Sequence, residues 1–395
     1  MKLQKGFSLL EMMVATVILV GVVAGCISAL LQAQQATQAV ALMANTQDNV
    51  RAGMHFMVQD LIQAGGGIPP GGIEIPNTGG TTATSAINRP GTATIFPNDY
   101  SYLPAVIPGW EIGQMTGSIS PSTGAVLVGT RATDIINVLY ADNTLVDPSG
   151  NLLNAYPVVQ TAPATPVCAG TIAASGATVT LAPACFTMPG GPVPVQVGNL
   201  IMFQNANGTA LEYVTGVAGQ VISFAGGDPG GLNASGKAAG TVASIMGGSP
   251  PTIITRVWMI TYYLNMTNPA LPQLIRQVNY PNYPAGAPAN PPQQIADGIE
   301  DMQFTYAITN STAPGGTYPN GPGDAPAPVL PWDTPDQIRA ANVFLAGRSE
   351  YAYRGSSTPN FFRDNLTSQI SFRNLAFVNT FNTSSTTPGN TPTAP

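Results

Sequence analysis

The sequence has few charged residues. Lysine, arginine, aspartate and glutamate together make up 8% of its 395 residues, far below the ~25% that is usual for globular proteins. Thirteen basic and nineteen acidic residues give a net charge of -6 at pH 7, and basic residues form no run. Because binding to a nucleic-acid backbone requires clustered lysine or arginine, this composition argues against nucleic acid as a partner.

Histidine is almost absent, and this restricts the chemistry that the chain can perform. The single histidine, His55, lies in a segment of helical pattern, so no Ser-His-Asp or Cys-His arrangement is evident. Metal-ligand spacings, phosphate-binding glycine loops and dinucleotide fingerprints are also missing from the sequence. The oxygen-rich stretch 141–151 raises calcium as a possibility, but it lacks EF-hand spacing and is better explained as a turn. We therefore expect no cofactor, no metal and no enzymatic activity.

Proline does not occur before residue 69, and between Phe7 and Leu31 the only charged side chain is Glu11. As a helix, these 25 residues would be ~37 Å long, which is enough to cross a bilayer. Residues 32–64 continue the helical pattern as an amphipathic segment that we expect to pack on a soluble domain. Its apolar face consists of Met43, Val50, Met54, Met57, Val58 and Leu61. Three glycines at 65–67, followed by two prolines, end the pattern.

Two lysines, Lys2 and Lys5, stand directly before the apolar run, and no basic cluster follows it. The positive-inside bias therefore predicts a single-pass membrane protein, with residues 1–6 in the cytoplasm and the C-terminal domain on the outer side of that membrane. The apolar run is too long for the core of an ordinary secretory signal peptide, which spans about 7 to 15 residues.

The residues Lys5-Gly6-Phe7-Ser8-Leu9-Leu10-Glu11 resemble the prepilin signal of type IV pilins and type II secretion pseudopilins. The resemblance implies that prepilin peptidase removes a leader, residues 1–6, by cutting between Gly6 and Phe7, and that the new amine of Phe7 is methylated. It also implies partners: other major and minor pilins, and an assembly platform in the inner membrane. The mature chain would be incorporated in a pilus or pseudopilus.

Glu11 allows two interpretations, because an ionised carboxylate near a membrane segment needs a compensating partner. The resemblance implies an assembly role, in which Glu11 pairs with the free Phe7 amine of a neighbouring subunit and sets the helix register. The local alternative is a capping box with Ser8, since a carboxylate near a helix N-terminus is favoured by the helix dipole. The adjacent Gly6-Phe7 pair favours the assembly role.

The remainder of the chain predicts a β-rich periplasmic domain. Residues 65–122 are expected to form a loop-rich connection, 123–381 the domain itself, and 382–395 a disordered tail. Short connections favour antiparallel pairing, so the expected fold class is α+β: a pilin-like long helix on a mainly antiparallel sheet. The expected strands are residues 125–128, 134–140, 177–181, 199–203, 211–217, 220–224, 253–264, 273–280, 299–308, 340–345 and 369–377.

Several of these segments extend the resemblance to PilW-type minor pilins, which help to initiate type IV pilus assembly. They are residues 133–140, 274–278, 295–306, 337–348 and 372–375. A J-type pseudopilin of type II secretion is the close alternative, because it shares the signal and the helix. A membrane-anchored surface adhesin with uncharged binding loops is a third possibility.

The three cysteines fall in two different environments. Cys26 lies inside the membrane helix, where a thiol usually acts as a small apolar packing group. Cys168 and Cys185 flank a stretch rich in alanine, threonine and glycine that is typical of a short hairpin. In an oxidising periplasm we expect a disulfide between them, which would contribute roughly 3 kcal/mol of stability. Free thiols or metal ligands are the weaker alternatives.

Overall fold

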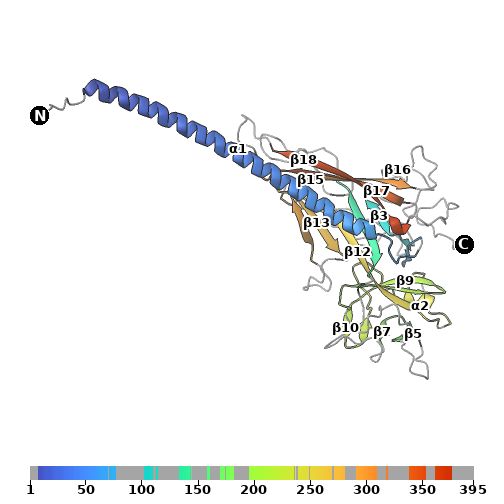
Figure 1. The fold of residues 1–395 in the computed structure, drawn as a ribbon. Helices are drawn as coiled ribbons and strands as arrows, with labels where there is room; N and C mark the ends of the chain where they lie inside the picture. Colours follow the sequence, from blue (N-terminus) through green and yellow to red (C-terminus); the bar gives the residue numbers. More distant parts are fainter. Residues whose placement is uncertain are drawn as a thin grey trace.

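The computed structural model consists of one long helix and a domain built from β-sheets (Figure 1). The structure describes residues 8–69, 71–76, 102–109, 113, 133–142, 144, 158–160, 170–173, 175–181, 195–234, 236, 239–248, 250–268, 271–280, 291–308, 317–318, 338–352 and 361–375. The N-terminal part of the helix projects freely, and its C-terminal part lies on the domain (Figure 1). This arrangement confirms the expected α+β, pilin-like fold class.

Helix α1 spans Leu9–Gln63 and contains 55 residues. It ends where the sequence introduces glycine. Gly65 has a φ of 78°, a backbone conformation that residues with a Cβ rarely adopt. The Gly65 N–H donates to the carbonyl of Leu139 at 2.8 Å, so the helix terminus is joined directly to a strand of the domain.

One stripe of α1 is buried, and it begins later than the sequence predicted. Its buried residues are Thr46, Val50, Gly53, Met54, Met57, Asp60 and Leu61. They recur every three or four positions, with two adjacent pairs, as one helical face requires. Met43 was expected on this face but remains 42% exposed. That expectation was wrong because full burial of the helix begins only at Thr46, and before it only Ala39 and Leu42 are half-buried.

The largest sheet has seven strands, all antiparallel, in the order β14-β13-β12-β4-β3, with β8 paired to β12 and β9 paired to β8. The 13-residue strand β12 is the central strand of this sheet, since it pairs with β13, β4 and β8. The strands are β3 (Val106–Gly109), β4 (Ile135–Ala141), β8 (Leu200–Asn205), β9 (Gly208–Tyr213), β12 (Ile253–Asn265), β13 (Gln273–Val278) and β14 (Gln293–Asp297).

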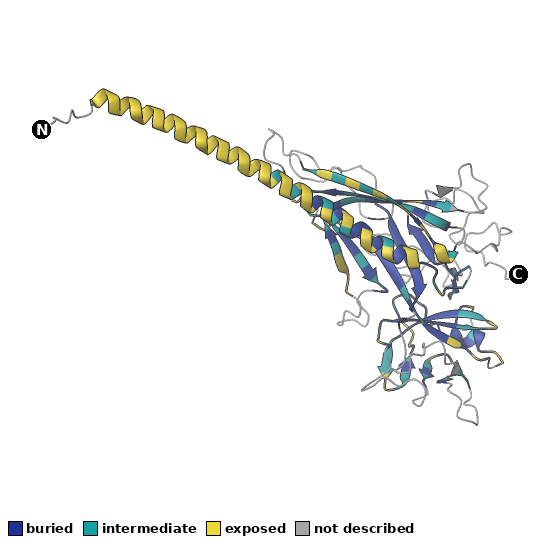
Figure 2. Cartoon of the chain, viewed as in Figure 1, coloured by how far each residue is buried: buried dark blue, intermediate teal, exposed yellow. Residues whose placement is uncertain are grey.

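A second, four-stranded sheet has the order β16-β15-β17-β18. Its strands are β15 (Ile299–Ile308), β16 (Thr317–Tyr318), β17 (Ile338–Arg348) and β18 (Arg363–Ser371), followed by the 3-10 turn η3 (Arg373–Leu375). The buried stripe of α1 shares one hydrophobic core with both sheets, so the helix is an integral part of the domain (Figure 2).

A smaller lobe carries a five-stranded sheet in the order β10-β11-β7-β6-β5. Its elements are β5 (Val158–Val159), β6 (Gly170–Ile172), β7 (Thr178–Thr180), β10 (Gly216–Ala218), β11 (Val221–Ser223) and the short helix α2 (Val242–Ile245). Phe203 and Phe224 pack edge to face in its separate core, with ring centroids 5.5 Å apart. The antiparallel β6-β7 pair is the hairpin that the sequence predicted between Cys168 and Cys185.

The structure also corrects some strand boundaries. The segment expected to be a loop-rich connection contains β1 (Ile73–Glu74), β2 (Tyr102–Leu103) and β3, none of which the sequence predicted. The expected strand 369–377 is instead β18, which ends at Ser371 before the chain turns into η3. Likewise the expected strand 211–217 is divided between β9 and β10. The strand expected at 125–128 lies outside the described residues.

Candidate functional site

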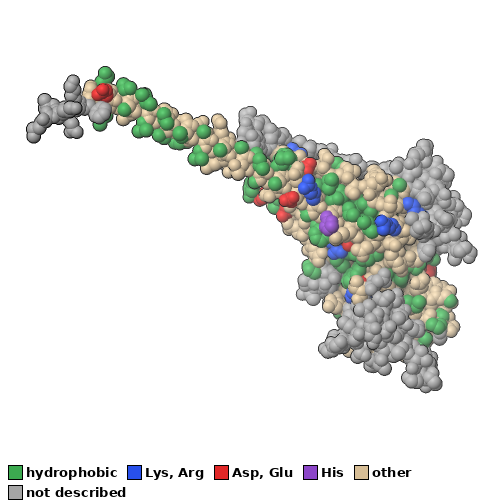
Figure 3. All heavy atoms as spheres, viewed as in Figure 1, with side chains coloured by type: hydrophobic (Ala, Val, Ile, Leu, Met, Phe, Trp, Pro, Cys, Tyr) green, Lys and Arg blue, Asp and Glu red, His purple; other side chains and the backbone are tan. Residues whose placement is uncertain are grey.

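The projecting part of α1 is the most prominent surface feature of the molecule. From Leu9 to Asn45 every side chain is exposed except Ala39 and Leu42, which are half-buried. Its most apolar 18-residue window has a mean hydropathy of 2.6 and no buried residue. Figure 3 shows hydrophobic side chains along this projection and charged side chains where the helix meets the domain. An exposed apolar surface of this size requires lipid or other helices to cover it.

Glu11 lies in the first turn of α1, far along the projection from the domain. Its carboxylate Oε2 accepts a hydrogen bond from the Ser8 backbone N–H at 3.0 Å. The local capping contact expected from the sequence therefore exists within a single chain. It does not exclude the assembly role, because the carboxylate remains exposed. The cleavage residues Gly6 and Phe7 lie outside the described residues.

At the other end of α1, Asp60 anchors the helix to the large sheet. Its two carboxylate oxygens accept hydrogen bonds from Arg276 Nε at 2.7 Å and Arg276 Nη2 at 3.0 Å. The hydroxyl groups of Tyr262 and Tyr140 donate to the same carboxylate at 2.5 and 3.1 Å. We call these four residues the Asp60 cluster; it joins α1 to strands β4, β12 and β13.

The Asp60 cluster contains a largely buried ion pair between Asp60 and Arg276. Side-chain exposure is 7% for Asp60 and 18% for Arg276. Burial, and then the charge of Asp60, raises the pKa of both Tyr140 and Tyr262, so their hydroxyls remain donors. Burial alone would lower the pKa of Arg276, but hydrogen bonding and attraction to Asp60 raise it overall. Paired in this way, the carboxylate is accommodated on an apolar helix face.

Sequence reasoning did not identify the Asp60 cluster, although one signal was available. Asp60 is a carboxylate on the same face as Met57 and Leu61, both of which are fully buried. A charge on an apolar stripe implies a partner on the opposing surface. The identity of that partner was not deducible, since Arg276 lies 216 residues away along the chain.

A second contact closes the C-terminal end of α1. The side-chain amide of Asn374, in η3, donates to the carbonyl oxygens of Gln63 and Ala64, both at 3.2 Å. These carbonyls belong to the last turn of the helix, where no intrahelical donor remains for them. The last described segment of the chain therefore caps the helix with which the structure begins.

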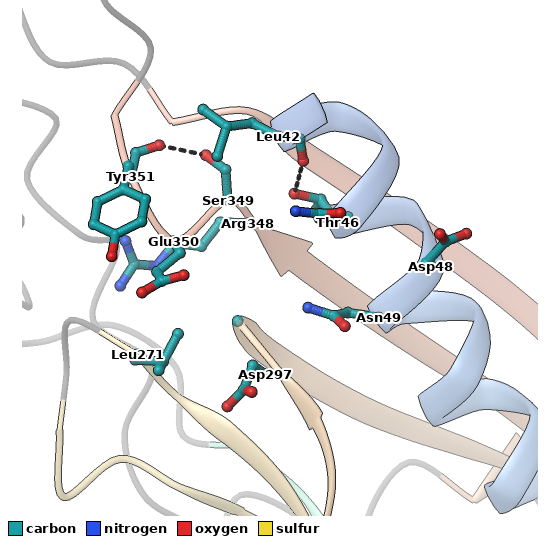
Figure 4. A pocket seen from close by; sticks show the side chains of 12 residues that line it. Leu42, Thr46, Asp48, Asn49, Leu271, Asp297, Arg348, Ser349, Glu350 and Tyr351 are labelled. Carbon is teal, nitrogen blue, oxygen red and sulfur yellow. Dashed lines mark hydrogen bonds between the residues drawn. The ribbon is translucent and has the colours of Figure 1, made fainter. Parts of the chain in front are cut away.

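A pocket of about 300 Å³ opens where α1 first meets the domain. In Figure 4, Thr46 and Asn49 of the helix face Asp297, Arg348 and Glu350 of the domain across this pocket. Arg348 is 2% exposed. Its guanidinium lies 3.8 Å from a carboxylate oxygen of Glu300 and 4.6 Å from the centre of the Phe361 ring. The junction is therefore polar, in contrast to the apolar core beneath the helix.

Two other residues considered in the sequence analysis, His55 and Asp142, make hydrogen bonds with nearby side chains. His55 is exposed, and its Nε2 lies 2.8 Å from the Gln59 amide on the same helix. Asp142, in the turn considered for calcium, receives hydrogen bonds from Arg256 and from Thr144. These bonds outweigh the effect of burial and lower the pKa of Asp142.

Cys168 and Cys185, for which the sequence predicts a disulfide, both lie outside the described residues. Among the described residues, the one free thiol is Cys26, which is exposed on the projecting helix.

Comparison with known proteins finds one match. A family model described as the prokaryotic N-terminal methylation motif matches residues 1–25. No curated protein and no solved structure matches the chain. The motif implies processing by prepilin peptidase and assembly with other pilins in a membrane machinery. Together with the apolar helix that follows it, the motif supports the assignment of this chain as a type IV pilin-like or pseudopilin-like protein.

Proposed function

We propose that the chain is a PilW-like minor pilin that takes part in initiating type IV pilus assembly. The observation that carries this proposal is the division of α1 into an exposed apolar half and a half built into the domain core. Such a helix can move from lipid into a bundle of similar helices without any change in the domain. The size of the β-rich domain favours a pilus subunit over a pseudopilin.

The same proposal fixes the topology and the processing. Residues 1–6 would face the cytoplasm and be removed by prepilin peptidase at the Gly6–Phe7 bond. The domain would lie in the periplasm. Phe7, methylated at its new amine, would then be the first residue of the mature chain, four residues before Glu11.

In assembly, Glu11 would exchange its local partner for an intermolecular one. Within the chain its carboxylate accepts one hydrogen bond, from Ser8, which leaves other acceptor positions unused. The charged Phe7 amine of a neighbouring subunit would neutralise the carboxylate as both enter an apolar environment. This pairing offsets the cost of inserting a lone charge, which is about 2.5 to 3.5 kcal/mol at the centre of a membrane helix.

The first test is intact-mass and N-terminal peptide analysis of the protein purified from its own membrane. We expect a mature chain that begins at methylated Phe7; a chain that begins at Met1 would refute the proposal. Glu11→Gln should be processed normally yet reduce piliation in a deletion strain. The matched control Asp48→Asn, at an exposed site on the same helix, should restore wild-type piliation.

A second measurement separates the two machines. A deletion strain of a minor pilin should lose surface pili and keep secretion of periplasmic enzymes. Normal piliation combined with lost secretion would instead identify a J-type pseudopilin. Normal piliation and normal secretion together with lost attachment to a surface would identify an adhesin.

A further inference from the structure

The smaller lobe contains a pocket that the pilus role does not use. It has a volume of about 440 Å³ and lies between the β7, β9 and β11 strands and helix α2, away from α1 (Figure 1). Small residues form its rim, among them Ala177, Ala225 and Gly236, all of them exposed. Its buried lining includes Phe224 and Glu212. The pocket is therefore mainly apolar, with one acidic group in its buried wall.

Glu212 has few partners for a buried carboxyl group. The residue is 4% exposed, and its Oε1 accepts one long hydrogen bond, 3.4 Å, from the Val242 N–H. In the part of the chain that the structure describes, no basic side chain forms an ion pair with it. A buried carboxyl group with one weak donor is costly to the fold, so its position against a cavity calls for an explanation.

A second buried acid increases the negative potential of this region. Asp228 is 1% exposed, and its two oxygens accept hydrogen bonds from the backbone N–H groups of Leu232 and Asn233 at 2.8 and 3.0 Å. Burial is the main cause that raises the pKa of Glu212 to about 9; the Val242 N–H opposes this rise and Asp228 adds to it. The empty pocket therefore holds a protonated Glu212 at neutral pH.

We propose that this pocket binds a primary ammonium group, with Glu212 as its counter-ion. The small side chains of the rim leave room for a slender chain, and the apolar wall covers the methylene groups behind the nitrogen. A compact ammonium suits a single carboxylate, whereas a guanidinium prefers a flat, two-point acceptor. A lysine side chain of another protein carries such an ammonium on four methylene groups, and the ring-bound amine of an amino sugar is the alternative that the test distinguishes. The proposal is independent of the pilus role.

Binding has a defined proton balance. The ligand enters as R–NH3+, Glu212 becomes a carboxylate, and about one proton is released to solvent at neutral pH. The other described titratable groups nearby are Asp228, Tyr213 and Tyr280. Burial, and then Asp228 and Tyr213, raise the pKa of Tyr280 well above its usual value. The β7, β11 and α2 segments contain none. Proton release therefore reports on Glu212.

The test is isothermal titration calorimetry of the full-length protein in detergent, in two buffers of different ionisation enthalpy. The probes are Nα-acetyl-lysine methylamide, its uncharged norleucine analogue and D-glucosamine. We expect at least one amine to bind with release of about one proton, and the norleucine analogue to bind at least tenfold more weakly. The stronger of the two amines identifies the source of the ammonium.

Three variants complete the test. Glu212→Gln keeps the shape of the pocket and should weaken amine binding at least tenfold without proton release. Ala225→Trp should block the rim, while Asp364→Asn, on strand β18 outside the pocket, should bind as wild type does. The proposal is overturned if neither amine binds the wild-type protein, if the norleucine analogue binds equally well, or if Glu212→Gln binds with unchanged affinity.

Discussion

Removal of the carboxylate charge of Asp60 should loosen α1 from its domain. Each carboxylate oxygen of Asp60 accepts one bond from Arg276 and one from a tyrosine hydroxyl. In Asp60→Asn one of these oxygens becomes an NH2 group, which cannot accept either bond, and the remaining oxygen no longer carries a charge for Arg276. Removing one partner of a buried ion pair costs about 3–5 kcal/mol. We expect the lower end, because Arg276 remains 18% exposed and still reaches Gln293 at 3.2 Å.

The loss should appear first as separation of the helix from the sheets. Denaturant unfolding of the full-length protein in detergent measures the total change in the free energy of unfolding. Hydrogen exchange of residues 46–63 measures the local opening, and protection there should fall more than in β12. The matched control is Asp48→Asn, an exposed residue on the same helix, which should change stability by less than about 0.5 kcal/mol.

A double-mutant cycle isolates the pair itself. Arg276→Met alone should be destabilising, because it leaves Asp60 buried with only the tyrosine hydroxyls. The double variant Asp60→Asn/Arg276→Met should lose at least ~1.5 kcal/mol less unfolding free energy than the sum of the two single losses. Residues in contact show interaction energies of about 0.5–3 kcal/mol in such cycles. The anchoring role is refuted if the free energies of unfolding of Asp60→Asn and Asp48→Asn differ by less than about 1 kcal/mol. It is also refuted if the double-mutant cycle gives no interaction energy between Asp60 and Arg276.

Three further predictions concern the domain. Because the pKa of Glu212 is about 9 in the folded chain against a reference value of 4.5, the folded state holds an extra proton between these values. Stability should therefore fall as pH rises through this window, by up to ~1.4 kcal/mol per pH unit from this group, and Glu212→Gln should flatten the profile; an unchanged profile would contradict this. Peptide mapping without reductant should find Cys168 joined to Cys185, whereas two alkylated free thiols would remove the assignment. Gly298→Ala should cost more than about 2 kcal/mol in thermal or denaturant unfolding, since Gly298 has a φ of 71° and a Cβ would meet the Arg348 carbonyl at 2.4 Å; near-wild-type stability would contradict the strain argument.

The sequence predicted best where one physical signal was strong and continuous. The absence of proline and charge specified α1, and the three glycines specified where it ends. Strands β12 and β15 were also predicted close to their observed limits, because β12 is a nearly continuous apolar and aromatic run and β15 alternates at Met302, Phe304 and Tyr306. Strand β18 was misplaced since its inward positions include Asp364 and Ser368, so its alternation carries little hydrophobic contrast.

The parts that could not be predicted depend on contacts between distant segments. The burial of Asp60 and the exposure of Met43 both follow from where the sheets meet the helix, and helical periodicity alone cannot give that position. Strands β1 and β2 contain two residues each and pair only with each other. Such short strands carry no periodicity that a sequence pattern could reveal.

The charge distribution along α1 explains why its two halves suit different surroundings. After Glu11 the next charged residue is Asp48, so 36 consecutive residues, 12–47, carry no charge. As a helix this stretch measures ~54 Å, whereas a bilayer core is ~30 Å thick. A membrane-inserted monomer therefore leaves more than 20 Å of uncharged helix outside the lipid core. In a fibre, neighbouring helices can cover that whole length without burying a charge, and the next charged residue, Asp48, lies close to Thr46, the first fully buried residue of the helix. The exposed helix is thus longer than a membrane anchor needs to be, and this excess is what a subunit that leaves the membrane for a helical bundle requires.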